Sequence, residues 1–347
     1  MSEKQIDQSR AGDPDNLVFK TDTRALPLKQ ALDFWQETAG SLYDVNIAQP
    51  NTFYTKHCTY RLGELLLTYC VSVAQKLSRS SYRIGADGYD HFELQYYLAG
   101  RWSRKDGRGE AQAAPGDLVI HDAAQAHAGA ASDFANLTLF VPRPLLAPLL
   151  DNPDRHNMRV LAADEPMAAL LRNHLDNLWR TLPLLTENQA AALASPTLEL
   201  VAATLNGAKR EDFSQGVSVA QLGGIRRYID AHALEPNISP AAIASAFGIS
   251  MRKLSYLFSG EGGVATYLQK RRLDLARAAL RDPAQAHKTI ADIGLEHGFV
   301  YAHNFTRAFQ RRHGLTPREI RAVAQSNWLT GGHESQSWFI RASLWGK

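Results

Sequence analysis

Residues 238–258 read ISPAAIASAFGISMRKLSYLF, and this stretch decides the fold of the C-terminal part of the chain. Ser239 is followed by a proline, and this pair predicts the start of a short helix, because the serine hydroxyl can accept a hydrogen bond from a free helical N–H. Gly248 predicts a tight turn, and Ser250 predicts the start of a second helix. Together these signals indicate a helix–turn–helix unit.

The second helix of this unit has one apolar and one polar face. Leu254, Leu257 and Phe258 recur at helical spacing and predict the buried face. The opposite face carries donors and cations, which a helix that reads the edges of DNA bases requires. The residues predicted to contact DNA from this helix are Arg252, Lys253, Ser255 and Tyr256.

The same order of signals returns later in the chain, where residues 289–314 read TIADIGLEHGFVYAHNFTRAFQRRHG. Thr289 predicts a helix start and Gly298 a turn. Phe305 and Phe309 predict the buried face of the helix that follows. The residues predicted to contact base edges are Ala302, His303, Thr306 and Arg307, and those predicted to contact phosphates are Arg311 and Arg312.

Residues 264–281 lie between the two units and contain no glycine or proline, which predicts one continuous helix. A rigid helix there would hold the two reading helices about one DNA turn apart, roughly 34 Å. Residues 221–325 carry 15 Lys and Arg against 8 Asp and Glu, a balance of +7, whereas the rest of the chain has a balance of −4. A basic domain is what contact with phosphates requires.

These motifs resemble the DNA-binding domain of AraC/XylS-type transcriptional regulators. The residues that carry the resemblance are Ala244, 248–250, Leu254, Phe258, 271–273, 276–277, Leu280, 290–293, 298–299, Phe305, 307–309, Arg312, 314–317 and Arg321. Gly294 departs from the family pattern, which usually has a small helix former such as alanine there, and should cost the helix about 1 kcal/mol. The alternative for this region is a helical bundle with a basic, solvated face.

The preceding residues predict a domain of strands and helices. A helix is expected over 28–39, strands around 60–73, 90–100, 115–121 and 134–142, and helices again over 163–205. Short strands with glycine turns suggest a sandwich or a barrel. The predicted fold class is therefore α+β, with a β-rich front domain and an all-α double helix–turn–helix domain.

The front domain resembles the cupin-like ligand-binding domain of the same family in the segments 97–100, 115–117 and 141–143. The resemblance implies a β-barrel that binds a small organic effector. Helices after such a barrel often dimerise, and the helices over 167–205 either do so here or only cap the barrel. The strand at 90–100 alternates and gathers polar groups on one face, and the residues predicted to contact the effector are His91, Gln95, Tyr97 and His121.

Two other functions are considered for the front domain. Some cupins are metal-dependent oxygenases or isomerases, whose metal needs closely spaced histidines and a carboxylate. The available set is His91, Glu93, His121 and His127, and the front domain has no His-x-His pair. Because nucleophile, phosphate-loop and zinc motifs are also missing from the sequence, we expect no catalytic residue, no metal and no cofactor. The other possibility is a front domain that senses a protein partner.

The length of 347 residues leaves room for about two domains. The expected divisions are a flexible lead at 1–20, a sensor and dimerisation domain at 21–205, a linker at 206–216, the DNA-binding domain at 217–325 and a tail at 326–347. No apolar run reaches the ~18 residues of a membrane span. The two cysteines, Cys58 and Cys70, have no metal-ligand spacing and favour a protein of the reducing cytoplasm. The resemblance implies a transcriptional activator and homodimer, whose partners are double-stranded DNA, a small effector and RNA polymerase.

Overall fold

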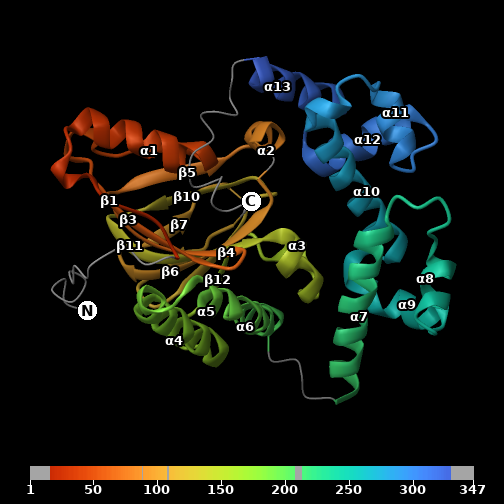
Figure 1. Ribbon diagram of the computed structural model, residues 1–347, viewed down its shortest axis with the longest axis horizontal. Helices are drawn as coiled ribbons and strands as arrows, with labels where there is room; N and C mark the ends of the chain where they lie inside the picture. Colours follow the sequence, from red (N-terminus) through yellow and green to blue (C-terminus); the bar gives the residue numbers. More distant parts are fainter. Residues whose placement is uncertain (1–15, 88, 108, 208–212, 330–347) are drawn as a thin grey trace.

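The computed structural model describes residues 16–87, 89–107, 109–207 and 213–329. Within these ranges the chain forms a β-rich front domain and an all-helical C-terminal domain, which lie side by side (Figure 1). Most of the predicted lead and tail, and residues 208–212 of the predicted linker, lie outside the described residues. None of the described helices has the length and apolar character that a membrane span requires.

The described strands of the front domain form two antiparallel sheets. The first has the order β1 (Leu17–Asp22), β3 (Thr55–Leu62), β4 (Leu65–Ser72), β11 (Phe134–Pro142), β6 (His91–Ala99), β9 (Leu118–Asp122) and β12 (Arg159–Leu161). The second has the order β2 (Asp44–Ile47), β5 (Gln75–Arg79), β10 (His127–Ala131), β7 (Trp102–Arg104) and β8 (Gln112–Ala113).

The prediction of a β-rich front domain ahead of a helical domain is confirmed. Residues of both sheets line one cavity, so the sheets face each other. They are not closed into a barrel, because the edge strands β1 and β12 of the first sheet do not pair with the edge strands of the second. The arrangement is compatible with a cupin-like jelly roll.

The alternation along β6 separates an apolar layer from a polar one. Phe92 and Leu94 are fully buried in the core that joins the first sheet to the helices behind it. The alternate residues Glu93, Gln95 and Tyr97 point to the other side of the sheet, where the cavity lies. Side chains change faces at each residue of a strand, so the sequence divides the residues of β6 into an apolar and a polar set. The packing then shows that the polar set faces the cavity.

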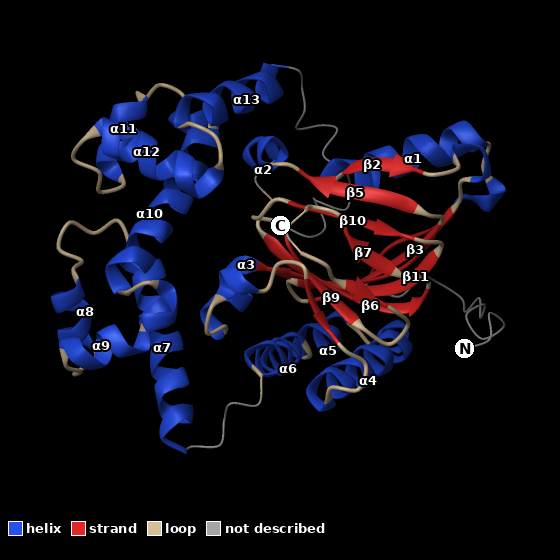
Figure 2. Ribbon diagram, turned by 180° about the vertical axis from the view of Figure 1, so that it is seen from behind, coloured by secondary structure: helices blue, strands red, loops and turns tan. Residues whose placement is uncertain are grey.

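Helices cover both sides of this pair of sheets (Figure 2). The helices α4 (Pro166–Thr181), α5 (Glu187–Ala192) and α6 (Ala194–Asn206) bury leucines such as Leu171 and Leu175 against the first sheet. The helix α1 (Leu28–Leu42), which extends three residues beyond the predicted end, places Trp35 in the core on the cavity side. Two shorter helices, α2 (Ser81–Asp87) and α3 (Arg143–Leu146), lie toward the C-terminal domain.

The C-terminal domain contains the helices α7 (Phe213–His232), α8 (Pro240–Ala246), α9 (Met251–Leu257), α10 (Val264–Arg281), α11 (Ile290–Glu296), α12 (Ala302–His313) and α13 (Pro317–Leu329). The predicted continuous helix between the two units is present as α10. It contributes Val264 and Leu268 to the core of the first unit and Leu273 and Leu280 to the core of the second. One helix therefore sets the distance between the two units.

Described helices and strands cross three of the predicted domain boundaries. Strand β1 begins at Leu17, inside the predicted lead, because it pairs with β3. Helix α7 begins at Phe213, inside the predicted linker. Helix α13 runs to Leu329, past the predicted end of the domain at residue 325, because nothing in this stretch breaks a helix before the glycines that follow.

Candidate functional site

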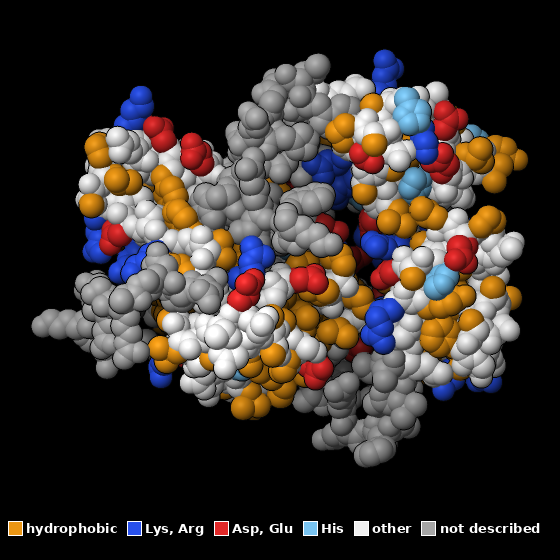
Figure 3. Space-filling model, in the orientation of Figure 1, with side chains coloured by type: hydrophobic (Ala, Val, Ile, Leu, Met, Phe, Trp, Pro, Cys, Tyr) orange, Lys and Arg blue, Asp and Glu red, His pale blue; other side chains and the backbone are white. Residues whose placement is uncertain are grey.

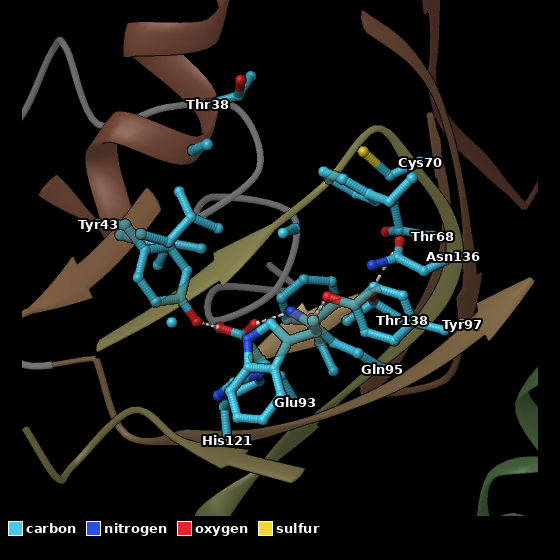
Figure 4. Close-up of a pocket in the computed structure, with 18 of the residues that line it drawn as sticks. Thr38, Tyr43, Thr68, Cys70, Glu93, Gln95, Tyr97, His121, Asn136 and Thr138 are labelled. Carbon is cyan, nitrogen blue, oxygen red and sulfur yellow. Dashed lines mark hydrogen bonds between the residues drawn. The ribbon is translucent and has the colours of Figure 1, made fainter. Parts of the chain in front are cut away.

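A cavity of about 90 Å³ lies between the two sheets of the front domain. Its wall is largely aromatic and aliphatic, with contributions from Trp35, Leu42, Leu77, Trp102, Phe134 and Phe140. Polar side chains approach it from α1 and from strands of the first sheet, and Figure 4 shows those of Tyr43, Glu93, Gln95, Tyr97, Asn136 and Thr138. The cavity is thus an apolar enclosure with a few converging polar groups, which is typical of a small-molecule site.

Glu93 is the charged group of this cavity, and its side chain is 3% exposed. Its Oε1 accepts a hydrogen bond of 2.7 Å from the Tyr43 hydroxyl and lies 3.1 Å from His91 Nε2, whereas its Oε2 receives only a 3.3 Å bond from Gln95 Nε2. Burial alone would raise the pKa of Glu93, but the hydrogen bond from His91 and the neighbouring donors outweigh it and lower the pKa to about 2. The carboxylate therefore stays ionised inside the protein.

Two stacked imidazoles lie beside this carboxylate. The rings of His121 and His127 are 5.0 Å apart, and the pairing of β6 with β9 places His121 opposite Glu93. Burial lowers the pKa of His121 to about 3 and also lowers the pKa of His127, so both rings are neutral at neutral pH. His121 Nδ1 and His127 Nε2 are buried without a hydrogen-bond partner in the described part of the chain.

The rival metal set does not form a binding cluster. Within the described residues, no group of three or more His, Cys, Asp or Glu side chains is arranged to hold a metal ion. His91 and Glu93 are instead hydrogen-bonded to each other, and His127 Nδ1 is bonded to the carbonyl of Gln125.

Three of the four predicted effector residues, Gln95, Tyr97 and His121, line the cavity. His91 is not part of the lining and contacts Glu93 instead, so its predicted role would be indirect. Sequence reasoning did not assign Glu93 to effector binding, nor did it find Asn136, Thr138 and Tyr43. Asn136 and Thr138 are two residues apart on β11, so their shared face could have been predicted from the sequence. Tyr43 could not, because only tertiary packing brings the end of α1 to Glu93.

The first helix–turn–helix unit presents its second helix openly. The Ser250 hydroxyl accepts from the N–H of Lys253 at the start of α9, and Gly248 has the positive φ of +60° that the predicted turn requires. Leu254 is fully buried. All four residues predicted to contact DNA from this helix are exposed: Arg252, Lys253, Ser255 and Tyr256.

The second unit is built in the same way, with a capping box between Thr289 and Asp292 and a turn at Gly298, where φ is +82°. Phe305 and Phe309 are fully buried, as predicted. Of the residues predicted to contact DNA from α12, Thr306 is half-buried and bonds to the carbonyl of Ala302, and the exposed ones are Ala302, His303, Arg307 and Arg311.

Arg312 lies apart from these exposed residues, in the interface with the front domain. Its guanidinium contacts Asp274 of α10 at 3.0 Å and Asp154 of the front domain at 3.1 Å. Burial alone would lower the pKa of Arg312, but the two carboxylates raise it above its ordinary value. In this arrangement the side chain is engaged by protein, and a phosphate contact would require these ion pairs to open.

Asp154 is the centre of that interface. It lies in a short 3₁₀ turn, Pro153–Arg155, and also contacts Lys270 at 3.3 Å and Arg143 at 3.5 Å. Figure 3 shows basic and acidic side chains together in the hollow between the two domains. A cleft of about 160 Å³ there is lined by Arg143, Asp154 and Arg312 together with Asp90 and Asp274, among others.

Arg143 connects this interface to the cavity strands. It contacts Asp90 at 2.7 Å and forms an ion pair with Asp122, and these two residues lie at the start of β6 and the end of β9. Glu93 and His121 are on the same two strands. The ends of these two cavity strands and the second reading helix are therefore joined through three successive ion pairs, from Asp90 or Asp122 to Arg143, from Arg143 to Asp154, and from Asp154 to Arg312.

A second contact holds the first unit to the front domain. Arg226 of α7 pairs with Glu261 and donates a 2.6 Å hydrogen bond to the carbonyl of Asp151. The side-chain amide of Asn152 donates a 2.8 Å hydrogen bond to the backbone carbonyl of Gly260. These contacts leave α9 exposed.

Comparisons with known proteins agree with this two-part arrangement. The family model described as an AraC-binding-like domain matches residues 41–206, and the model described as a helix–turn–helix domain matches residues 243–322. The XylDLEGF operon transcriptional activator of Pseudomonas putida is 27% identical over 167 residues, which cover 48% of this chain and 50% of that protein. The chain thus spans about half the length of this relative.

Two further similarities cover more of the chain. An uncharacterized protein in the nit 5′ region of Bacillus sp. (strain OxB-1) is 22% identical over 249 residues, which cover 65% of this chain and 90% of that protein. The crystal structure of the AraC-like transcriptional activator CuxR has a TM-score of 0.52 and 24% identity, and covers 74% of this chain and 95% of that one. The likeness to CuxR shows the fold. The two family models and the curated relatives place the chain in the AraC/XylS-type family of transcriptional regulators.

Proposed function

We propose that this protein is a transcriptional regulator that binds double-stranded DNA through α9 and α12, in response to a small organic effector held in the cavity. The observation that carries the proposal is the pair of exposed polar helix faces fixed to one continuous helix, α10. Two readers held by one helix suit two successive major-groove segments on one side of the duplex.

We assign the proposed contacts to bases and phosphates according to how exposed each arginine side chain is. Arg252 and Arg307 project from the two reading helices and are the proposed base readers, since arginine can bind guanine through two hydrogen bonds. Arg311 is the proposed phosphate contact in the closed arrangement. Arg312 becomes available to phosphate only after it leaves Asp154 and Asp274.

The effector would act by changing the balance between a closed and an open arrangement of the domains. A ligand that moves Glu93 or His121 would act on strands whose ends hold Arg143, and Arg143 shares Asp154 with Arg312. Because a ligand shifts an equilibrium only by its differential affinity for the two states, the effector must bind one arrangement more tightly.

The proposal extends to the assembly and the place of action. Helix α4 carries the 55% exposed Leu170 and the turn after it the 68% exposed Leu184, which supports a homodimer contact on this side. We propose that the protein acts as an activator that contacts RNA polymerase, in the cytoplasm where genomic DNA lies. Sedimentation of the full chain and of Leu170→Glu tests the dimer, since an apolar contact should weaken with the added charge.

The test of the DNA proposal uses the full chain and a random duplex library. Selection should enrich one sequence that spans two major-groove segments, and footprinting should show protection on one face. The variant with both Arg252→Ala and Arg307→Ala should lose this preference, whereas Lys29→Ala, which removes an exposed cation from the front domain, should keep it. No enrichment, or equal enrichment by the double variant, contradicts the proposal.

The alternatives for the front domain have their own readouts. Stoichiometric iron, manganese or zinc in the purified protein, together with consumption of a substrate, would favour the metal-dependent enzyme. A front domain that senses a protein partner would leave the cavity unresponsive to every metabolite tested, while DNA binding would change with the partner.

A further inference from the structure

The cavity in the front domain is unevenly charged, and this limits what can occupy it. Glu93 is buried at its lining, and the residues that line the cavity in the described structure include no lysine and no arginine. Arg79, a cation on a nearby strand, is already paired with Asp87 through bonds of 2.6 and 2.7 Å. The carboxylate therefore has no free cationic side chain within the lining.

The hydrogen bonds of Glu93 leave one of its oxygens underused. Oε1 has two partners, Tyr43 and His91, whereas Oε2 has only the long bond from Gln95. An ionised carboxylate can accept about four hydrogen bonds. A ligand that donates hydrogen bonds and carries positive charge would satisfy both the open oxygen and the buried charge.

The remaining polar groups also suit a donor. The rings of His121 and His127 are neutral, each has one nitrogen without a partner, and both line the cavity. A neutral imidazole has one nitrogen that accepts a hydrogen bond. The aromatic walls at Trp35 and Trp102 add faces that attract cations and cover apolar atoms.

We propose that the effector is a small organic ammonium compound, whose charged nitrogen binds Glu93 Oε2 and whose apolar body is enclosed by the aromatic walls of the cavity. This inference rests on the proposed role of the cavity as an effector site. It excludes carboxylate effectors, because a second anion beside Glu93 would be buried against a like charge with no lysine or arginine in the described lining to compensate.

His91 decides between a cationic and a neutral ligand. An uncharged imidazole that donates from Nε2 leaves the negative charge of Glu93 unbalanced, whereas a protonated ring would neutralise the pair. The variant His91→Gln keeps a hydrogen-bond donor and cannot carry a charge. The proposal requires His91→Gln to retain the preference for an ammonium ligand.

The experiment uses the full chain and three probes of one shape: cyclohexylmethylamine, cyclohexylmethanol and cyclohexanecarboxylate. Calorimetry and the shift in Tm report binding at pH 7, where the amine is protonated and the acid ionised. We expect the amine to bind about 10- to 100-fold more tightly than the alcohol, which corresponds to one charge-assisted hydrogen bond. The carboxylate should give no shift.

Variants locate the site. Glu93→Gln should remove the advantage of the amine over the alcohol, and Glu64→Gln, which neutralises an exposed carboxylate of the same domain, should leave it unchanged. If Glu93→Gln does not fold, the ranking of the amine, the alcohol and the carboxylate on the unchanged protein still tests the charge. The proposal is overturned if the alcohol or the carboxylate binds as tightly as the amine, or if the amine does not bind even at millimolar concentration.

A separate measurement keeps this inference distinct from the proposed function. The same preparations are titrated with the duplex from the selection experiment. Intact DNA binding without amine binding defeats only the assignment of the ligand, whereas amine binding without DNA binding defeats only the regulator.

Discussion

The two helix–turn–helix units share their caps and turns but differ in how free their reading helices are. Helix α9 projects Arg252 and Lys253 into solvent, and its unit is held to the front domain through the hydrogen bond from Arg226 to the carbonyl of Asp151. Helix α12 exposes Arg307 but engages Arg312 with Asp154 of the front domain. The same motif thus has a free reading helix in one copy and a partly restrained one in the other, and of the two described reading helices only α12 is paired with the front domain.

The salt dependence of DNA binding provides the largest test of this difference. If both units bind and make ~6 to 10 phosphate contacts, affinity of the full chain should fall by ~10³ to 10⁵ between 50 and 200 mM salt. Binding by the first unit alone should give about half the slope of log K against log salt. Titration at several salt concentrations, with and without the effector, measures which slope applies, and a slope near zero would contradict phosphate binding altogether.

The proposed base readers give the next largest effect. Replacing Arg307 by Ala should cost roughly 1–3 kcal/mol on the preferred duplex and relax the choice of base at one position. Arg252→Ala should do the same at a position about one helical turn away. Titration of each variant against single-base changes of the selected duplex checks this, and a uniform loss on all duplexes would show that the residue contacts phosphate instead.

Gly294 distinguishes the cores of the two units. A Cβ built there would lie 2.9 Å from Phe305 Cδ1, so the glycine makes room for a phenylalanine. In the first unit, Ala244 takes the place of Gly294 and Leu254 takes the place of Phe305. The first unit therefore combines a larger residue on its first helix with a smaller one on its second.

We expect Gly294→Ala to destabilise the domain by about 1 kcal/mol net, since overpacking should exceed the gain in helix propensity. In the variant that also carries Phe305→Leu, the alanine should become favourable. A double-mutant cycle of urea unfolding measures the coupling between the two sites. If the changes in unfolding free energy of the two substitutions are additive, the contact between position 294 and Phe305 does not affect stability.

Acid should weaken the second unit before the first. His313 and His297 are buried in the second unit, and burial lowers the pKa of His313 to about 4 and that of His297 below its usual value. The unfolded chain then binds more protons than the folded one below pH 6.5, so stability falls as the pH drops from about 6.5 toward 4. The slope is up to ~1.4 kcal/mol per pH unit for each histidine.

Hydrogen exchange at pH 7 and pH 5 measures this difference between the units. Protection of α12 should decrease more than protection of α9. The variant His313→Phe should show a smaller pH dependence. Equal losses in the two helices would contradict the assignment of acid sensitivity to the buried imidazoles.

The adjacent arginines Arg311 and Arg312 give the smallest effect. Arg311→Ala should lower the salt slope by about 1 in the presence and in the absence of effector. Arg312→Ala should lower it only where the domains are open, so its effect should depend on the effector. Asp154→Asn should raise the slope of the effector-free protein toward that of the open one. Identical behaviour of the two arginines would show that the ion pair to Asp154 does not restrain binding.

The sequence was most informative where local signals act. Ser239, Ser250 and Thr289 cap helices as their position predicts, because a cap requires only a side chain and the next backbone N–H groups. The glycines at both turns and the buried faces of α9 and α12 also follow from local geometry. Family resemblance then supplied the order of the two domains.

Contacts between distant segments could not be predicted in this way. Tyr43 reaches Glu93 across 50 positions of the chain, and Arg312 reaches Asp154 across 158. Arg312 belongs by sequence to an exposed basic end of a helix, and only the packing of the domains shows that it is engaged. The alternation of β6 likewise showed that Glu93 and Gln95 share a face but not that this face is the interior.

The ion pair between Asp154 and Arg312 also makes the front domain a competitor of DNA. Two carboxylates of the protein, Asp154 and Asp274, occupy the guanidinium that a phosphate would need. Binding free energies are reciprocal between two sites. If the effector favours release of Arg312, the operator must in turn tighten the hold of the cavity on its effector by the same factor. A regulator already on its promoter would therefore respond to less effector than the same protein free in solution.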